Sequence, residues 1–319
     1  MNKFLKIAGT LGATIVPVAL SAQENKKPNV ILIMTDQQRF DAMGCTSDGL
    51  VITPNLDRLA DDGYLFTSAY SSAPSSTPAR AGLLTGCSPW IHGMLGYGNQ
   101  AERYPYEMPR MLKDNGYAAL AAGKMHYFPQ NNTRGYDIVL FDESGRHEVP
   151  YFESDYRKWF YANRFGDNPD VTGIGWNEHA AGEYQLPEEV HPTRWTADRA
   201  IEMIEGYHAD NPLYLKVSFA RPHSPYDPPK RFVDMYEGRE ILKASYGEWE
   251  PEDWRTLEDP AKDKNAFIGH FSDEYVENSR KHYFANMTFV DEQIGRVRQP
   301  SCGKTSFRPD GRRFSGVDK

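Results

Sequence analysis

The sequence is poor in cysteine: its 319 residues include only Cys45, Cys87 and Cys302. Their spacing matches no zinc site, and an odd number leaves at least one thiol without a partner in the chain. A disulfide between Cys45 and Cys87 is compatible with the sequence, but no pattern supports it. A small domain held together by disulfides or by zinc is therefore excluded.

The sequence also lacks an excess of positive charge. Its 36 Lys and Arg stand against 44 Asp and Glu, so the formal net charge is −8. This balance argues against a nucleic-acid partner, because phosphates attract a basic surface. It leaves room for an anionic substrate, since a pocket can be locally basic on an acidic protein. An apolar fraction of 39% without internal repeats indicates a globular protein of one large domain or two modest ones.

Beyond the N-terminus, no stretch is apolar enough to span a membrane, so we expect no stable membrane anchor in the mature protein. Residues 1–22 join a basic start, Met1–Lys6, to an apolar stretch, Ile7–Leu20. This order is typical of a secretory signal peptide and predicts a periplasmic or secreted protein. The alternative is an N-terminal membrane anchor, for which the apolar stretch is short.

Helical and strand patterns alternate along the chain, which predicts the α/β class. Residues 29–34 form a continuous apolar run that reads as a buried strand. The next helix is marked by Thr53 as its cap, by Pro54 at its first position and by Gly63 as its stop. The other predicted strands cover residues 64–70, 117–122 and 213–219, the other predicted helices cover 78–84, 106–115, 196–207 and 272–297, and an irregular aromatic-rich stretch covers 134–187.

The most informative segment, Ser76–Gly86, reads Ser-Thr-Pro-Ala-Arg-Ala-Gly-Leu-Leu-Thr-Gly. Ser76 falls at the cap of a predicted helix, where backbone N–H groups and the helix dipole favour an anion such as sulfate. Arg80 lies one turn further on and faces the same side. The segment resembles the signature of the type I sulfatases, Cys/Ser-x-Pro-x-Arg followed by Leu-Thr-Gly. Cys87 opens a second Cys-Ser-Pro, but Ile91 stands where the arginine belongs, so the chain resembles the serine type.

Three further motifs occur in the order of that family. Asp36-Gln37 ends the first strand and matches the family's first pair of calcium ligands, whose hard oxygens suit this ion. The segment 123–126 matches Gly-Lys-x-His, and the segment 222–225 matches Pro-His-x-Pro. The resemblance therefore covers roughly residues 27–297.

The resemblance implies an alkaline-phosphatase-like mixed sheet flanked by helices on both faces. It also implies that a serine-type formylglycine-generating enzyme converts Ser76 to formylglycine before export. In the family, the hydrated aldehyde of formylglycine attacks sulfur. The converted residue and the first ligand pair bind the calcium ion. The implied calcium ligands here are Asp36, Gln37 and the converted Ser76.

The same resemblance assigns catalytic roles to four further residues. Arg80 and Lys124 neutralise the sulfate oxygens, as charged groups aimed at a transition state do. His223 protonates the departing alcohol as a general acid. His126 then assists the release of sulfate.

The sequence departs from the family near its C-terminus. The family supplies two more calcium ligands, a second sulfate lysine and a smaller C-terminal subdomain from sequence that has no counterpart after Val297. Residues 298–319 instead hold six Lys or Arg, two Asp and no periodicity. We expect residues 23–297 to be an incomplete, N-terminal sulfatase catalytic domain and residues 298–319 to be an irregular basic tail, read out of frame or after an interruption. A genuine basic tail is the alternative.

A sulfuric ester hydrolase acting on sulfated glycans fits export and the aromatic-rich residues 134–187, because sugars stack on aromatic faces. The segments 123–129 and 142–146 resemble bacterial sulfatases that act on glycosaminoglycan fragments, which points to 2-O-sulfated uronic acids. One alternative is a phosphodiesterase or phosphonate monoester hydrolase of the same superfamily, with formylglycine or unmodified Ser76 as its nucleophile. Another is a catalytically inactive, truncated sulfatase-like protein. A glycan-binding protein would have no use for the signature that begins at Ser76.

Overall fold

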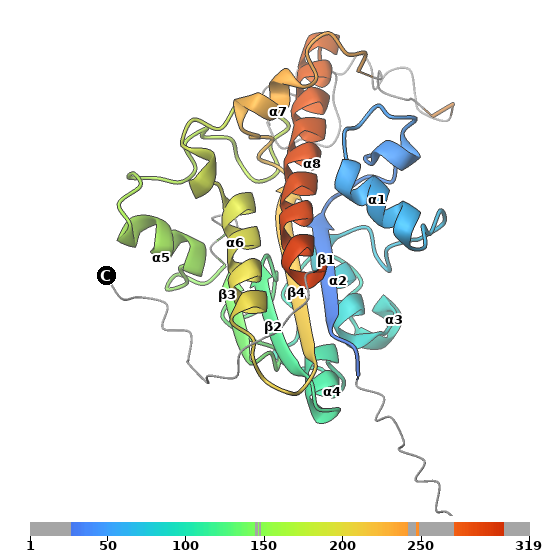
Figure 1. Ribbon diagram of the computed structural model, residues 1–319, viewed down its shortest axis with the longest axis vertical. Coiled ribbons are helices and arrows are strands. Elements are labelled where there is room, and N and C mark those ends of the chain that lie inside the picture. Colours follow the sequence, from blue (N-terminus) through green and yellow to red (C-terminus); the bar gives the residue numbers. More distant parts are fainter. Residues whose placement is uncertain (1–26, 144–145, 147, 242–246, 249–270, 303–319) are drawn as a thin grey trace, which may run out of the picture.

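The computed structural model describes residues 27–143, 146, 148–241, 247–248 and 271–302 (Figure 1). The predicted signal peptide and residues 303–319 of the predicted tail lie outside this part of the chain. Among the described residues, none of the helices combines the length and the apolar character that crossing a membrane requires.

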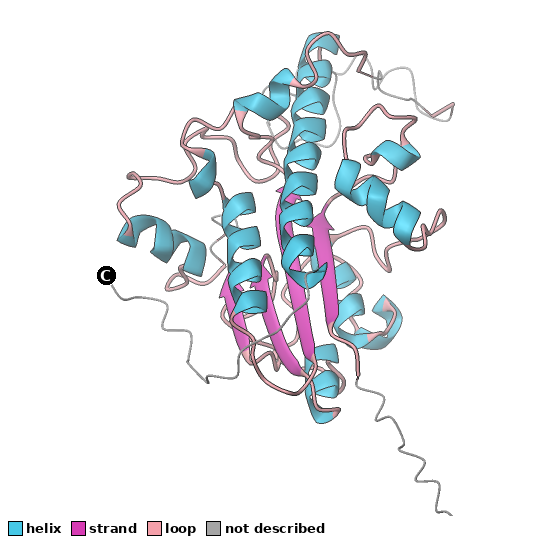
Figure 2. Ribbon diagram, in the orientation of Figure 1, coloured by secondary structure: helices cyan, strands magenta, loops and turns pink. Residues whose placement is uncertain are grey.

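Within the described part of the chain, a four-stranded sheet forms the centre of the molecule (Figure 2). Its strands β1, β2, β3 and β4 cover Val30–Asp36, Ala118–Gly123, Ile138–Phe141 and Leu213–Pro222, in the spatial order β1-β4-β2-β3. The central strand β4 is buried along its whole length, as expected for a strand covered on both faces. Because all three pairings are parallel, the carboxyl ends of the strands share one edge of the sheet.

Helices cover both faces of this sheet (Figures 1 and 2). On one face, α6 (Pro192–Glu205) and α8 (Asp273–Cys302) pack against Leu215 and Val217 of β4. On the other face, α2 (Ser76–Thr85) and α4 (Met108–Asp114) share a core with Tyr214. Helix α1 (Pro54–Asp62) packs against α8. The remaining elements are α3 (Pro89–His92), α5 (Asp155–Ala162), α7 (Lys230–Asp234) and the 3₁₀ turns η1 (Gly44–Thr46) and η2 (Glu188–Val190).

The predicted α/β class with helices on both faces is confirmed, but the sheet of the described residues is parallel rather than mixed. Each connection between strands is long enough to cross over and return in the same direction. Helix α1 begins at Pro54 and is followed by Gly63, as predicted. The hydroxyl of Thr53 does not cap this helix; it accepts from the N–H of Gly44 at 2.7 Å and donates to Asp57 Oδ1 at 3.1 Å.

The strand predicted at residues 64–70 is wrong. The segment is a loop in which Tyr64, Phe66 and Tyr70 are 93%, 79% and 90% exposed. Aromatic residues favour a strand through contacts with a neighbouring strand, and none of the four described strands pairs with this segment. The local pattern therefore lacks the tertiary partner that would turn it into a strand.

Two stretches predicted to be irregular contain regular elements. Strand β3 and helix α5 lie between residues 134 and 187, and Ser154 Oγ caps α5 by accepting from the N–H of Arg157 at 3.3 Å. The predicted tail begins later than Arg298, because α8 continues to Cys302. An ion pair between Arg298 and Asp62, the last residue of α1, holds this part of the helix in place.

Candidate active site

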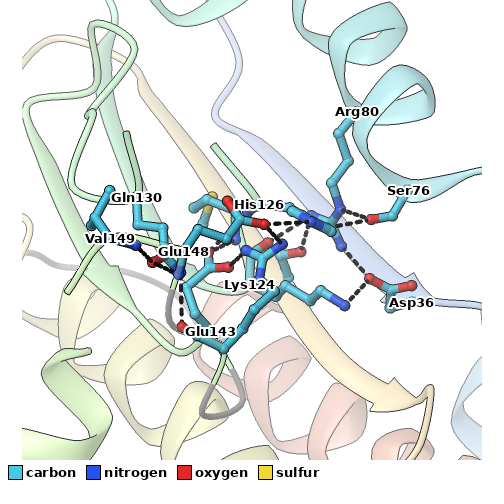
Figure 3. A network of polar contacts seen from close by, with 12 residues as sticks. Asp36, Ser76, Arg80, Lys124, His126, Gln130, Glu143, Glu148 and Val149 are labelled. Carbon is cyan, nitrogen blue, oxygen red and sulfur yellow. Dashed lines mark hydrogen bonds and ion pairs between the residues drawn. The ribbon is translucent and has the colours of Figure 1, made fainter. Parts of the chain in front are cut away.

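Five motif residues meet at the carboxyl edge of the sheet, namely Asp36, Ser76, Arg80, Lys124 and His126 (Figure 3). Asp36 is the last residue of β1, and Ser76 and Arg80 lie in the first turns of α2. Lys124 and His126 follow the last residue of β2. Ligands of open α/β sheets bind at this edge, where loops after several strands come together.

Asp36 lies between two cations. Its Oδ2 atom is 2.8 Å from Arg80 Nη2 and 2.8 Å from Lys124 Nζ, and all three side chains are buried. Burial alone would raise the pKa of the Asp36 carboxyl, but the charges of Lys124 and Arg80 hold that pKa well below its usual range. Burial lowers the pKa of Lys124, and the charge of Asp36 opposes that decrease. With Lys124 protonated, the group carries one excess positive charge, which favours an anion.

Ser76 is the first residue of α2 rather than its cap, because Ser75 occupies the cap position. Its hydroxyl lies 2.8 Å from His126 Nδ1 and accepts from Arg80 Nε at 3.2 Å. The motif therefore places Ser76 Oγ between an imidazole and a guanidinium, at the start of a helix whose N-terminus favours negative charge.

A close backbone contact aligns the loop after β2. The N–H of Lys124 donates to the carbonyl of Ser218 in β4 at 2.7 Å. Gly123 has φ +99°, and a Cβ there would lie 2.1 Å from Ser218 O, so only glycine fits. Arg80 Nη1 donates to Ser218 Oγ at 3.2 Å and to Lys124 O at 2.6 Å, which ties α2 to the same point.

His126 is held in the left-handed region, at φ 56°. The buried Glu143 stabilises this turn, because its Oε1 accepts from the N–H groups of Met125 at 2.8 Å and of His126 at 2.9 Å. Burial raises the pKa of Glu143 to about 8, against the hydrogen bond from Met125 and the charge of Lys124. An ion pair with Arg146 engages the other carboxyl oxygen.

His223 follows β4 and adjoins the cluster. Its backbone N–H donates to the backbone oxygen of Asp36 at 3.1 Å, and its ring atom Nδ1 lies 2.9 Å from Ser224 O. Burial and the charge of Lys124 lower the pKa of His223 to about 4, so its ring is neutral at pH 7 in this state. The backbone thus brings His223 to the site.

Gln37 lies apart from these polar contacts. It has φ 60°, its backbone oxygen accepts from the Tyr283 hydroxyl at 2.9 Å, and it lines a cavity of about 290 Å³ between the segment after β1 and α8. The described residues include no group of three or more His, Cys, Asp or Glu side chains able to hold a metal. Asp36 is the one carboxylate of the expected ligand set, and two cations already neutralise it. The described residues alone therefore do not fit a calcium site, and the predicted ligation by Asp36, Gln37 and Ser76 stays a prediction.

Sequence reasoning assigned no role to several residues of the site. Ser218 and Lys216 are polar residues on one face of a buried strand, a period of two that could have singled them out. Lys216 is buried over the ring of Tyr127, with Nζ 5.6 Å from the ring centroid. Burial, followed by repulsion from Arg80, lowers the pKa of Lys216 to about 7. Glu143 follows β3, a strand that the sequence did not predict.

Comparison with known proteins identifies related chains. The sulfatase family model matches residues 28–299. An arylsulfatase of Clostridium perfringens is 33% identical over 283 residues, covering 85% of this chain and 58% of its own length. An iduronate 2-sulfatase of Mus musculus is 26% identical over 312 residues, covering 90% of this chain and 54% of its own. The crystal structure of a phosphonate monoester hydrolase of Agrobacterium radiobacter superposes with a TM-score of 0.65 at 23% identity, covering 86% of this chain and 59% of that one.

The chain thus spans just over half the length of these curated relatives. The structural neighbour supports the predicted alkaline-phosphatase-like fold. The matched residues include all four motifs, from Asp36 to His223. By the extent of this match, the chain belongs to the sulfatase family.

Proposed function

We propose that this chain carries catalytic residues of a sulfuric ester hydrolase that removes sulfate from carbohydrates through formylglycine formed at Ser76. One observation carries the proposal: Ser76 Oγ lies 2.8 Å from His126 Nδ1 and 3.2 Å from Arg80 Nε, beside a buried cluster with excess positive charge. The family generally uses formylglycine and a divalent metal. The converted side chain supplies a hydroxyl that attacks sulfur and a second hydroxyl whose deprotonation releases sulfate.

The described residues support that chemistry by holding charge and moving protons. Arg80 and Lys124 hold the sulfate oxygens, where their preorganised positive charge favours the transition state. His126 accepts the proton of the second hydroxyl at Nδ1, the atom that contacts Ser76 Oγ at 2.8 Å. His126 would thereby take up the proton whose loss allows sulfate to leave.

His223 donates a proton to the alcohol oxygen as the sulfur–oxygen bond breaks. With a pKa of about 4 it is neutral at pH 7 in the state described, so it has no proton to spare for the alcohol. A bound sulfate ester brings negative charge beside Lys124 and Asp36 and raises the pKa of His223. In this proposal, His223 therefore becomes protonated when the substrate binds.

The proposed substrates are glycosaminoglycan-derived sugars, with 2-O-sulfated uronates first among them. The iduronate 2-sulfatase relative supports this choice by its name, and the aromatic residues of the stretch 134–187 support a sugar in general. The proposal includes a serine-type formylglycine-generating enzyme as a partner before export, and a periplasmic or secreted location.

Peptide mass spectrometry across Ser76 tests the conversion. The chain is made in an anaerobic host together with the serine-type modifying enzyme, and we expect the Ser76 peptide to lose a pair of hydrogens. The Ser75→Ala variant keeps this loss, whereas Ser76→Ala abolishes it. An unmodified Ser76 in that host would reject the formylglycine chemistry and favour the inactive chain or an unmodified serine nucleophile.

The alternative function is hydrolysis of phosphonate monoesters or phosphodiesters. The Agrobacterium radiobacter neighbour shares the fold with this chain, and a fold hosts many chemistries. Turnover of a sulfate monoester and of a phosphodiester by the same modified preparation separates the two functions. Faster turnover of the phosphodiester would overturn the sulfatase assignment.

A further inference from the structure

The second ring nitrogen of His126 faces a carboxylate. Nδ1 lies 2.8 Å from Ser76 Oγ, while Nε2 is buried, has no hydrogen bond among the described residues and lies 3.6 Å from Glu148 Oε1 (Figure 3). His126 as a whole is 5% exposed. A buried ring N–H without an acceptor is costly, so the Glu148 carboxylate is positioned to accept a hydrogen bond from a protonated Nε2. Catalytic contacts are often long before substrate binds, which the 3.6 Å separation fits.

The segment that carries Glu148 is fixed by Gln130, which is fully buried. Gln130 Oε1 accepts from the N–H groups of Glu148 at 2.7 Å and of Val149 at 3.3 Å. Its Nε2 donates to the backbone oxygen of Arg146 at 2.8 Å. Because Gln130 lies four residues after His126, the loop that carries the imidazole also positions its carboxylate partner.

Two side chains complete the surroundings of Glu148. Arg146 Nη1 lies 3.1 Å from Glu148 Oε1, and the hydroxyl of Tyr97 donates to the same oxygen at 3.4 Å. The Tyr97 ring also meets the His126 ring edge-on, with centroids 6.0 Å apart. The carboxylate is thus held from two sides while it faces the imidazole.

We propose that Glu148 is a positioning residue: it keeps the proton of neutral His126 on Nε2 and so leaves Nδ1 free to accept a proton from the group at position 76. The catalytic consequence rests on the proposed function. The placement of the proton does not, because it concerns only residues of this chain and is defined for unmodified Ser76 as well.

The tautomer of His126 is measured by nitrogen NMR on the full chain labelled with ¹⁵N-histidine. The sequence has nine histidines, and the His126→Gln variant assigns the signals of His126. We expect a deprotonated, pyridine-type shift at Nδ1 and a protonated, pyrrole-type shift at Nε2. Glu148→Gln removes the charge and mixes the two tautomers, Glu148→Asp keeps the expected one in part, and the exposed Glu153→Gln control leaves it unchanged.

A kinetic readout applies where the modified protein hydrolyses a sulfate ester. Glu148→Gln lowers kcat roughly 10- to 100-fold, as loss of an orienting partner does, with little change in KM. Glu148→Asp recovers part of the loss. If Glu148→Gln unfolds at the assay temperature, the aspartate variant carries both measurements.

The outcomes separate the two proposals. A proton on Nδ1 of His126 in the unchanged chain overturns the role of Glu148, whether or not sulfate esters are hydrolysed. The same holds if the glutamine variant keeps the tautomer and kcat of the unchanged chain. The expected tautomer in a protein that hydrolyses no sulfate ester rejects the proposed function and leaves the role of Glu148 supported.

Discussion

The carboxylate of Asp36 lies 2.8 Å from the guanidinium of Arg80, and this buried pair joins the end of β1 to the first turns of α2. A buried charge that loses its partner is strongly destabilising, whereas an exposed one is not. Removing either member of the pair is therefore expected to destabilise the fold, whatever its role in the proposed chemistry.

Asp36→Asn is expected to lower the free energy of unfolding by about 3–5 kcal/mol, because it leaves Arg80 and Lys124 buried side by side without a counter-charge. Asp61→Asn in α1 is the matched control. Asp61 is exposed, so its replacement costs well under about 1 kcal/mol. Denaturant unfolding at pH 7 measures both, and equal losses would contradict the role of Asp36.

Gly123→Ala is expected to destabilise the fold by roughly 2–5 kcal/mol, because it combines a strained backbone with a collision. Its Cβ would lie 2.1 Å from Ser218 O, at a position with φ +99°. Gly96→Ala is the control, since a Cβ at Gly96 meets nothing within 4 Å. Thermal unfolding of the two variants should differ clearly, and a stable Gly123→Ala variant would show that the contact with β4 is dispensable.

Lys216→Met is expected to stabilise the protein at pH 7 by up to about 4 kcal/mol. The reason is that the substitution removes a buried amine, and burial of this amine in the folded protein disfavours its protonated form. The pKa of Lys216 is about 7 in the folded protein, against an ordinary value of 10.5 for an exposed lysine, so the unfolded chain binds more protons between these values. The stability of the unchanged chain therefore rises with pH across this window, and the gain of the variant shrinks from pH 7 to pH 10. The exposed Lys158→Met serves as the control at both pH values; a gain independent of pH would contradict the account.

Asp227 forms an ion pair with Arg221, and this pair joins the two ends of the short segment that carries His223. Arg221 donates to both of its carboxylate oxygens at 2.7 Å, and His191 Nε2 lies 3.5 Å away. Burial alone would raise the pKa of Asp227, but Arg221 and His191 hold it well below its usual range.

Asp227→Asn is therefore expected to cost about 3–5 kcal/mol at pH 7. Because the pKa of Asp227 is depressed in the folded state, its stabilisation is present above about pH 4 and is lost as the pH falls further. The difference in the free energy of unfolding between the variant and the unchanged chain therefore becomes smaller as the pH falls below 4. Urea unfolding over this range tests the trend, with the exposed Asp210→Asn as a control that shows none.

Elements marked by local chemistry could be predicted from the sequence. Pro54 and Gly63 mark the two ends of α1, because proline restricts the backbone and glycine frees it whatever the rest of the fold does. The signature at Ser76 marked the start of α2. The meeting of Ser76, Lys124 and Asp36 was implied by the resemblance to the type I sulfatases rather than by a local pattern.

What depends on distant partners could not be predicted in this way. The segment 64–70 has the composition of a strand but no pairing partner among the described strands. Glu143 and Glu148 act through contacts with the turn at His126, 17 residues or more away along the chain, and nothing in their own neighbourhood signals that. Lys216 carries a visible signal, a charge inside an apolar strand, but its neighbours decide what the charge does.

The pairing of β1 with β4 has a consequence for biosynthesis. Asn29 Oδ1 accepts from the N–H of Leu213, a partner 184 residues further along the chain. A ribosome that adds about 5–20 residues per second makes the partner strand of β1 roughly 10–40 s after β1 itself. Throughout that interval the apolar residues 30–34 lack the strand they pair with, which leaves an unpaired, aggregation-prone strand in the nascent chain.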